Sequence, residues 1–163
     1  MNTIELMKSI HADEVLEIYR EGINTGIATF ETRVPSWSQF DKKHLNHSRI
    51  VLIEDGIICG WAALSPVSSR ECYGGVAEVS VYVNTKNRGR GFGKKLLEEL
   101  IRHSEENGIW SLLSVIDQEN IASIQLHVTC GFRKIGVREK IAKMSGVWRT
   151  TVMFERRSKS VGL

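Results

Sequence analysis

The stretch that decides the fold runs from residue 81 to residue 94 and reads VYVNTKNRGRGFGK. Its first three residues end a run over residues 76–83 that is rich in β-branched side chains, which is typical of a strand. Glycines then alternate with other residues from 89 to 93, and apolar spacing predicts an amphipathic helix over residues 94–106. We therefore expect a strand, a glycine-rich loop and a helix in direct succession.

A loop of this kind can bind an anion. Glycines let the backbone approach a ligand closely, and a helix N-terminus adds unpaired N–H groups and a partial positive charge. Four basic residues surround it: Arg88, Arg90, Lys94 and Lys95. It is not a P-loop, because Lys95 stands where Ser or Thr would hold magnesium, and G-x-G-x-G is not the dinucleotide fingerprint. Taken alone, the loop equally suits a plain turn with solvated basic side chains.

Composition limits the other possibilities. The chain of 163 residues and 18.4 kDa has room for one domain, with 42% hydrophobic and 25% charged residues. The 22 Lys+Arg against 19 Asp+Glu give a net charge of +3, too mild to predict a nucleic-acid partner. We expect residues 1–155 to form the domain and residues 156–163 to be a polar, frayed tail.

The cysteines predict a reducing compartment. Cys59, Cys72 and Cys130 are odd in number and none lies in a C-x-x-C pair, which argues against a disulfide framework or a zinc site. The histidines form no metal-ligand spacing with carboxylates, so we expect no metal. No signal peptide and no apolar run of roughly 20 residues is evident. These features together predict a cytoplasmic protein with no membrane partner.

The remaining segments alternate between strands and helices. Strands are expected over residues 4–7, 49–54, 57–64, 76–83, 110–116, 132–137 and 147–155. Helices are expected over residues 13–21, 94–106 and 120–130, and from a capping box at Ser36 to about residue 46. This order predicts an α/β (α+β) fold, with a mixed central sheet and helices on both faces.

Two segments resemble motifs of the GCN5-related N-acetyltransferases (GNAT). Arg88, Gly91 and Gly93 match the family's Gln/Arg-x-x-Gly-x-Gly/Ala loop, and NIASIQLH at 120–127 with Gly131-Phe132 resembles its second motif. The resemblance implies acetyl-CoA as co-substrate, with a strand that splays from its neighbour and pairs with pantetheine. It places the coenzyme on Val81, Tyr82, Val83, Arg88, Gly89, Arg90, Gly91, Phe92, Gly93, Lys94, Asn120 and Ser123.

Within the family, the chain is most similar to phosphinothricin and methionine-sulfoximine acetyltransferases, on residues 78–83, 126–127 and 28–32. This similarity implies acetylation of the α-amine of a small amino acid or amino-acid-like toxin, and a homodimer. Two alternatives stay open: acetylation of protein N-termini or lysines, and acetyl-CoA sensing without turnover.

Two residues could carry the proton transfers. Glu78 lies in a segment of Val and Ala, where burial would raise its pKa toward that of a useful base. The resemblance assigns it as general base, although it could instead be a structural carboxylate. His127 could protonate the departing thiolate or share the base role, or it could simply be a packed side chain. No cysteine is placed to carry an acetyl group, which favours direct transfer.

The acceptor site is implied by the resemblance alone. It would lie between residues 30–32 and residues 71–75 and include Phe30, Thr32, Tyr73, Gly74 and Tyr82. Relatives that act on methionine sulfoximine often have an Arg just before the catalytic strand, where this chain has Gly74. Three other arginines could supply the missing charge: Arg33, Arg70 and Arg149.

Overall fold

The computed structural model describes every residue from Met1 to Leu163 and contains one seven-stranded mixed sheet. The strand order is β1-β2-β3-β4-β5-β7-β6, and only the β4–β5 pair is parallel. The mixed sheet expected from the sequence is confirmed. The strands are β1 (Asn2–Leu6), β2 (Ile50–Glu54), β3 (Ile57–Pro66), β4 (Val76–Val83), β5 (Ser111–Asp117), β6 (Arg133–Met144) and β7 (Val147–Arg157).

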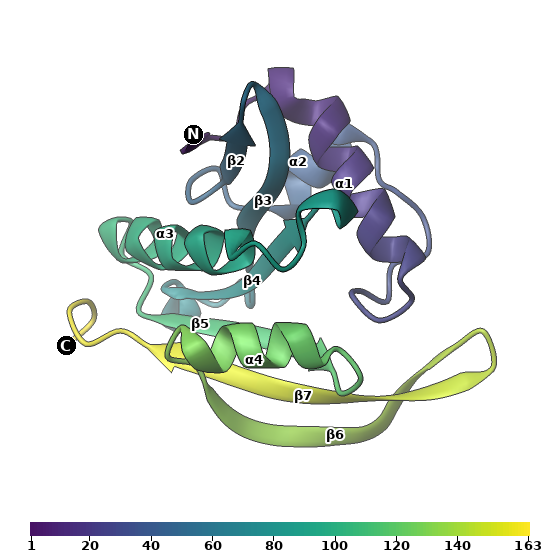
Figure 1. Ribbon diagram of the computed structural model, residues 1–163. Coiled ribbons are helices and arrows are strands. Elements are labelled where there is room, and N and C mark those ends of the chain that lie inside the picture. The colour runs from purple at the N-terminus through teal and green to yellow at the C-terminus, as the bar shows by residue number, and fades with distance from the viewer.

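Helices cover both faces of this sheet, as predicted (Figure 1). They are α1 (Ala12–Asn24), α2 (Trp37–Lys43), α3 (Phe92–Glu106) and α4 (Ile121–Thr129), and none has both the length and the hydrophobicity that a bilayer crossing needs. Alternation along β3 divides the core: Ala62 and Leu64 belong to the cluster with α3, whereas Trp61 and Ala63 belong to the cluster with α1 and α2.

Strands β4 and β5 separate soon after they meet. They pair only where residues 76–78 of β4 face residues 111–113 of β5. Beyond Glu78 and Leu113 the two strands diverge, and each continues with its other neighbour, β3 or β7. The predicted splayed pair is therefore confirmed, and it opens a gap in the middle of the sheet.

Strand β6 is longer than predicted. The sequence suggested an end at Val137, where a run rich in charged residues begins. The strand instead continues to Met144, through an irregularity in its register between Arg138 and Ala142. It forms with β7 a long hairpin, the extended arm in green and yellow in Figure 1.

The predicted fraying of residues 156–163 is wrong. Strand β7 reaches Arg157, and the next residue, Ser158, is buried with its hydroxyl 2.8 Å from Glu105 Oε1. The Arg157 guanidinium also donates to the carbonyl of Val161 at 2.9 Å. The Ser158 contact fastens the start of the tail to the end of α3, and the Arg157 contact holds the residues that follow.

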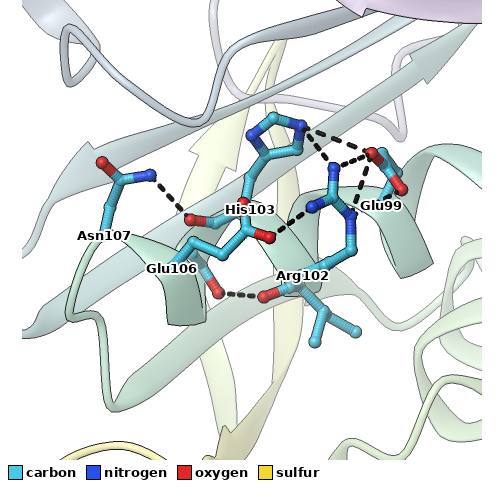
Figure 2. A network of polar contacts seen from close by, with 7 residues as sticks. Glu99, Arg102, His103, Glu106 and Asn107 are labelled. Carbon is cyan, nitrogen blue, oxygen red and sulfur yellow. Dashed lines mark hydrogen bonds and ion pairs between the residues drawn. The ribbon is translucent and has the colours of Figure 1, made fainter.

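Two helix ends also differ from expectation. The Ser36 capping box is present, but α2 ends at Lys43 because His44 adopts an extended conformation. Helix α3 begins at Phe92, two residues early, and its last turns carry an exposed polar network (Figure 2). There Arg102 bridges Glu99 and Glu106, an arrangement that adds little stability because water screens it.

Candidate active site

A cavity of about 680 Å³ lies where β4 and β5 diverge. Its walls come from residues 78–83 of β4, residues 114–117 at the end of β5, the glycine loop and one side of α4. Residues 25 and 27–30, between α1 and α2, together with Lys43 at the end of α2, line it as well. The gap in the sheet is thus the floor of an open site.

The free edge of β4 faces this gap. The Asn84 N–H donates to the carbonyl of Cys59 at 2.8 Å, so this residue directs its backbone groups toward β3. Because such residues alternate along an antiparallel ladder, Tyr82 and Ser80 do the same, while Val81 and Val83 direct theirs away from β3. The backbone of Val81 and Val83 is therefore available to pair with an extended ligand.

The glycine loop presents a run of unpaired donors. Gly89 and Gly91 have positive φ values of 76° and 78°, and Gly91 is the N-cap of α3 without a side-chain cap. No backbone N–H from Gly89 to Lys94 donates to an acceptor within the protein. Successive free N–H groups at a helix N-terminus bind anions, so this loop suits a pyrophosphate.

The basic side chains around the loop do not all gather there. Arg88 and Lys94 line the cavity. Arg90 instead pairs with Glu54 at 2.6 Å and lies over the Phe92 ring, and Lys95 Nζ is 3.0 Å from Asn2 Oδ1. The expected cluster of four cations is wrong for Arg90 and Lys95, because polar partners on β1 and β2 hold these two side chains.

Glu78 lies at the point where the strands separate. Its side chain is half-buried on the cavity wall, on the strand face that also carries Ser80 and Tyr82. Burial raises the pKa of the Glu78 carboxyl above its ordinary value, and the Lys43 ammonium opposes part of that rise. The raised pKa makes this carboxylate a better proton acceptor than an ordinary glutamate.

His127 lines the cavity from α4 but is only 4% exposed. Its Nδ1 lies 2.7 Å from the carbonyl oxygen of Ser123, which can only accept, so Nδ1 carries the proton. Its Nε2 then accepts from the Ser114 hydroxyl at 3.0 Å. Burial lowers the pKa of His127, so the ring is neutral, with both nitrogens occupied.

Asn120 and Ser123 begin α4 at the cavity wall. The Asn120 side chain caps the helix by accepting the Ser123 N–H at 3.3 Å. Ser114, whose hydroxyl meets His127, had no signal in the sequence, since a serine in a strand is ordinary. The structure thus joins the predicted residues of α4 to β5.

The expected acceptor residues are only partly together. Phe30 and Tyr82 line the cavity, whereas Thr32, Tyr73 and Gly74 lie outside its lining within this chain. Tyr73 is instead largely exposed, with the Arg70 guanidinium 5.7 Å from its ring centre. The sequence also missed other residues that line the cavity, among them Tyr19, Thr29, Lys43 and Asp117.

Comparisons with known proteins agree with this geometry. The Acetyltransferase (GNAT) family model matches residues 13–132. The chain is 30% identical over 161 residues to the phosphinothricin N-acetyltransferase of Alcaligenes faecalis, covering 94% of this chain and 81% of the relative. It is 31% identical over 142 residues to the L-methionine sulfoximine/L-methionine sulfone acetyltransferase of Pseudomonas paraeruginosa, covering 82% of this chain and 81% of the relative.

A solved structure shows the same fold. The GNAT superfamily phosphinothricin acetyltransferase from Sinorhizobium meliloti, in complex with AcCoA, matches with a TM-score of 0.90 at 28% identity. The match covers 99% of this chain and 90% of that one. The chain therefore belongs to the acetyltransferase (GNAT) family and is an N-acetyltransferase.

Proposed function

We propose that this enzyme transfers an acetyl group from acetyl-CoA to the α-amine of a small amino acid or amino-acid-like toxin. The observation that carries the proposal is the position of Glu78, a half-buried carboxylate where β4 and β5 diverge into the cavity. The relatives named for phosphinothricin and methionine sulfoximine support this acceptor class.

The residues present fit the coenzyme. The free N–H groups between Gly89 and Lys94 would hold its pyrophosphate, with Arg88 and Lys94 adding positive charge. The unpaired backbone of Val81 and Val83 would pair with the pantetheine arm. Acetyl-CoA supplies a thioester whose carbonyl carbon an amine can attack.

The protein's part in the reaction is to bring a neutral amine to that site. The α-amine of a free amino acid is mainly protonated at neutral pH. Glu78 would take a proton from this ammonium group, directly or through water. None of the three cysteines lines the cavity, which favours direct transfer over an acetyl-enzyme. With both ring nitrogens of His127 occupied, solvent is the simpler proton source for the departing thiolate.

A thiol-release assay tests this function. The protein is incubated with acetyl-CoA and one candidate acceptor at a time. The acceptors are amino acids, methionine sulfoximine, methionine sulfone, phosphinothricin, and peptides that carry a free N-terminus or lysine. We expect release of free thiol with at least one of the free amino acids or analogues. Turnover confined to the peptides would support the alternative acceptor, and coenzyme binding without any turnover would support a sensor.

A further inference from the structure

A single cationic side chain lies at the end of the cavity that holds Glu78. The cations that line the whole cavity are Lys43, Arg88 and Lys94. Two of them, Arg88 and Lys94, flank the glycine loop and its free N–H groups. Lys43 comes instead from the end of α2, and its positive charge opposes part of the rise that burial causes in the pKa of Glu78.

The arginines that the sequence offered for this purpose are placed elsewhere. Arg149 lies 2.9 Å from both Asp117 and Glu119, which neutralise its charge. Arg70 lies over Tyr73, outside the cavity. Arg33 lines a separate cavity of about 560 Å³. Lys43 is therefore the cation that an acidic group beside Glu78 would meet.

Lys43 is free to serve a ligand. Its side chain is 52% exposed, and its ion pair with Glu31 is loose, with 3.9 Å between Nζ and Oε1. The residue also lines the second cavity, and Tyr19 is the other residue shared by both cavities. Lys43 therefore lies where the two cavities adjoin.

We infer that Lys43 is a specificity-determining residue that binds the carboxylate of the acceptor, while Glu78 receives the proton of its amine. This inference rests on the proposed function. An α-amino acid carries its ammonium and carboxylate on one carbon, so it needs one anionic and one cationic partner facing the same space. A lysine suits this task because its flexible stem lets the ammonium follow the carboxylate. The acceptor side chain would occupy the second cavity, toward Arg33 and Gln39.

The test compares an acid with its uncharged counterpart. Steady-state kinetics are measured with L-methionine sulfone and its carboxamide, or with the same pair made from whichever amino acid the wild type prefers. Lys43→Gln is compared with Lys42→Gln, which alters an exposed neighbour on α2 that lines neither cavity. We expect Lys43→Gln to reduce kcat/KM for the acid roughly 10- to 100-fold, the usual cost of a charged hydrogen bond. The loss should lie in KM.

The other readouts separate recognition from a general defect. In Lys43→Gln, kcat/KM for the carboxamide and KM for acetyl-CoA should each change less than threefold. Lys42→Gln should resemble the wild type in all these values. An equal loss on acid and carboxamide, or no loss on either, would overturn the inference while leaving the proposed function intact. A wild type that acetylates no free amino acid would overturn both.

Discussion

The Nε of Arg149 lies 2.9 Å from Oδ2 of the buried Asp117, so a side chain of β7 neutralises a carboxylate at the end of β5. The same guanidinium donates to the carbonyl of Gly26 at 3.0 Å. The next two carbonyls, of Ile27 and Ala28, lie 3.5 Å from Asn120 Nδ2 and the Tyr82 hydroxyl. Three elements of the site therefore hold one wall of the cavity.

Removing Arg149 should weaken both stability and acceptor binding. Arg149→Met leaves Asp117 charged and without its cation, and breaking a buried pair in this way costs about 3–5 kcal/mol. The freed segment from Gly26 to Phe30 should raise KM for the acceptor more than KM for acetyl-CoA. Urea unfolding and steady-state kinetics measure the two effects.

The double variant Arg149→Met/Asp117→Asn provides the control. Because it no longer buries an unpaired charge, it should recover at least about 1 kcal/mol of the lost stability. If the double variant lost the sum of the free energies lost by Arg149→Met and Asp117→Asn alone, a direct coupling between these two side chains would be contradicted.

The contacts of His127 predict a structural role. His127→Asn preserves a donor for the Ser123 carbonyl but leaves the Ser114 hydroxyl without its partner, which should cost about 1–3 kcal/mol. A general acid is worth about 10²–10⁴-fold in rate, so a structural His127 predicts a loss of kcat of less than about tenfold. Chemical unfolding and kcat, measured below the melting temperature of the variant, distinguish the two roles.

The pH dependence provides a second test of the same residue. Because the folded-state pKa of His127 is lowered, the neutral ring stabilises the fold above the ordinary value of 6.5, and that contribution is lost as the pH falls. The stability gap between wild type and His127→Asn should therefore narrow from pH 8 to pH 5. A constant gap would contradict a buried, neutral ring.

The sequence predicts best what short stretches encode. The bounds of β4 are found as expected because a β-branched run is followed at once by polar residues. The loop from Arg88 to Gly93 is equally local, since Gly89 and Gly91 take φ values that other residues avoid. Residues of these two segments, together with Asn120 and Ser123, line the cavity.

The remainder depends on contacts between distant segments. Nothing near Lys43 in the sequence indicates that the end of α2 faces Glu78, since packing of Phe40 against Trp61 sets that position. Counting charges likewise placed Arg90 at the anion site, although its partner Glu54 lies at the end of β2. Charge patterns specify how many cations are present, whereas tertiary packing decides where each one points.

Replacing Glu78 should separate activity from stability. Glu78→Gln removes the proposed base, and we expect kcat to fall by about 10²–10⁴-fold, the usual value of such catalysis. The same change should stabilise the protein at pH 8, because burial penalises the carboxylate. A raised pKa means that the fold favours the neutral acid. The gain in stability should therefore vanish below pH 4.5, the ordinary pKa of a glutamate.

Thermal unfolding at pH 8 and pH 4 measures the stability effect, and thiol release measures the activity. Glu78→Gln with wild-type turnover would contradict the assignment of the base. A lower melting temperature than the wild type at pH 8 would show that the carboxylate is instead held by favourable contacts.

Two glycines allow binding to be separated from backbone strain. Gly91 and Gly108 both have φ of 78°, and an added Cβ would meet no protein atom within 4 Å at either position. Alanine at each should therefore cost a similar amount of folding free energy, about 1–2 kcal/mol for a left-handed residue. Gly91 lines the cavity at the N-terminus of α3, whereas Gly108 lies beyond the opposite end of that helix.

Only Gly91→Ala should therefore weaken the binding of acetyl-CoA, because the added methyl group would keep the pyrophosphate away from the free N–H groups. We expect at least about a tenfold rise in Kd by calorimetry for Gly91→Ala, equivalent to about 1.4 kcal/mol, and less than a twofold change for Gly108→Ala. Equal effects on Kd would mean that the loop acts only through stability. An unchanged Kd in Gly91→Ala would show that the pyrophosphate does not bind at the start of α3.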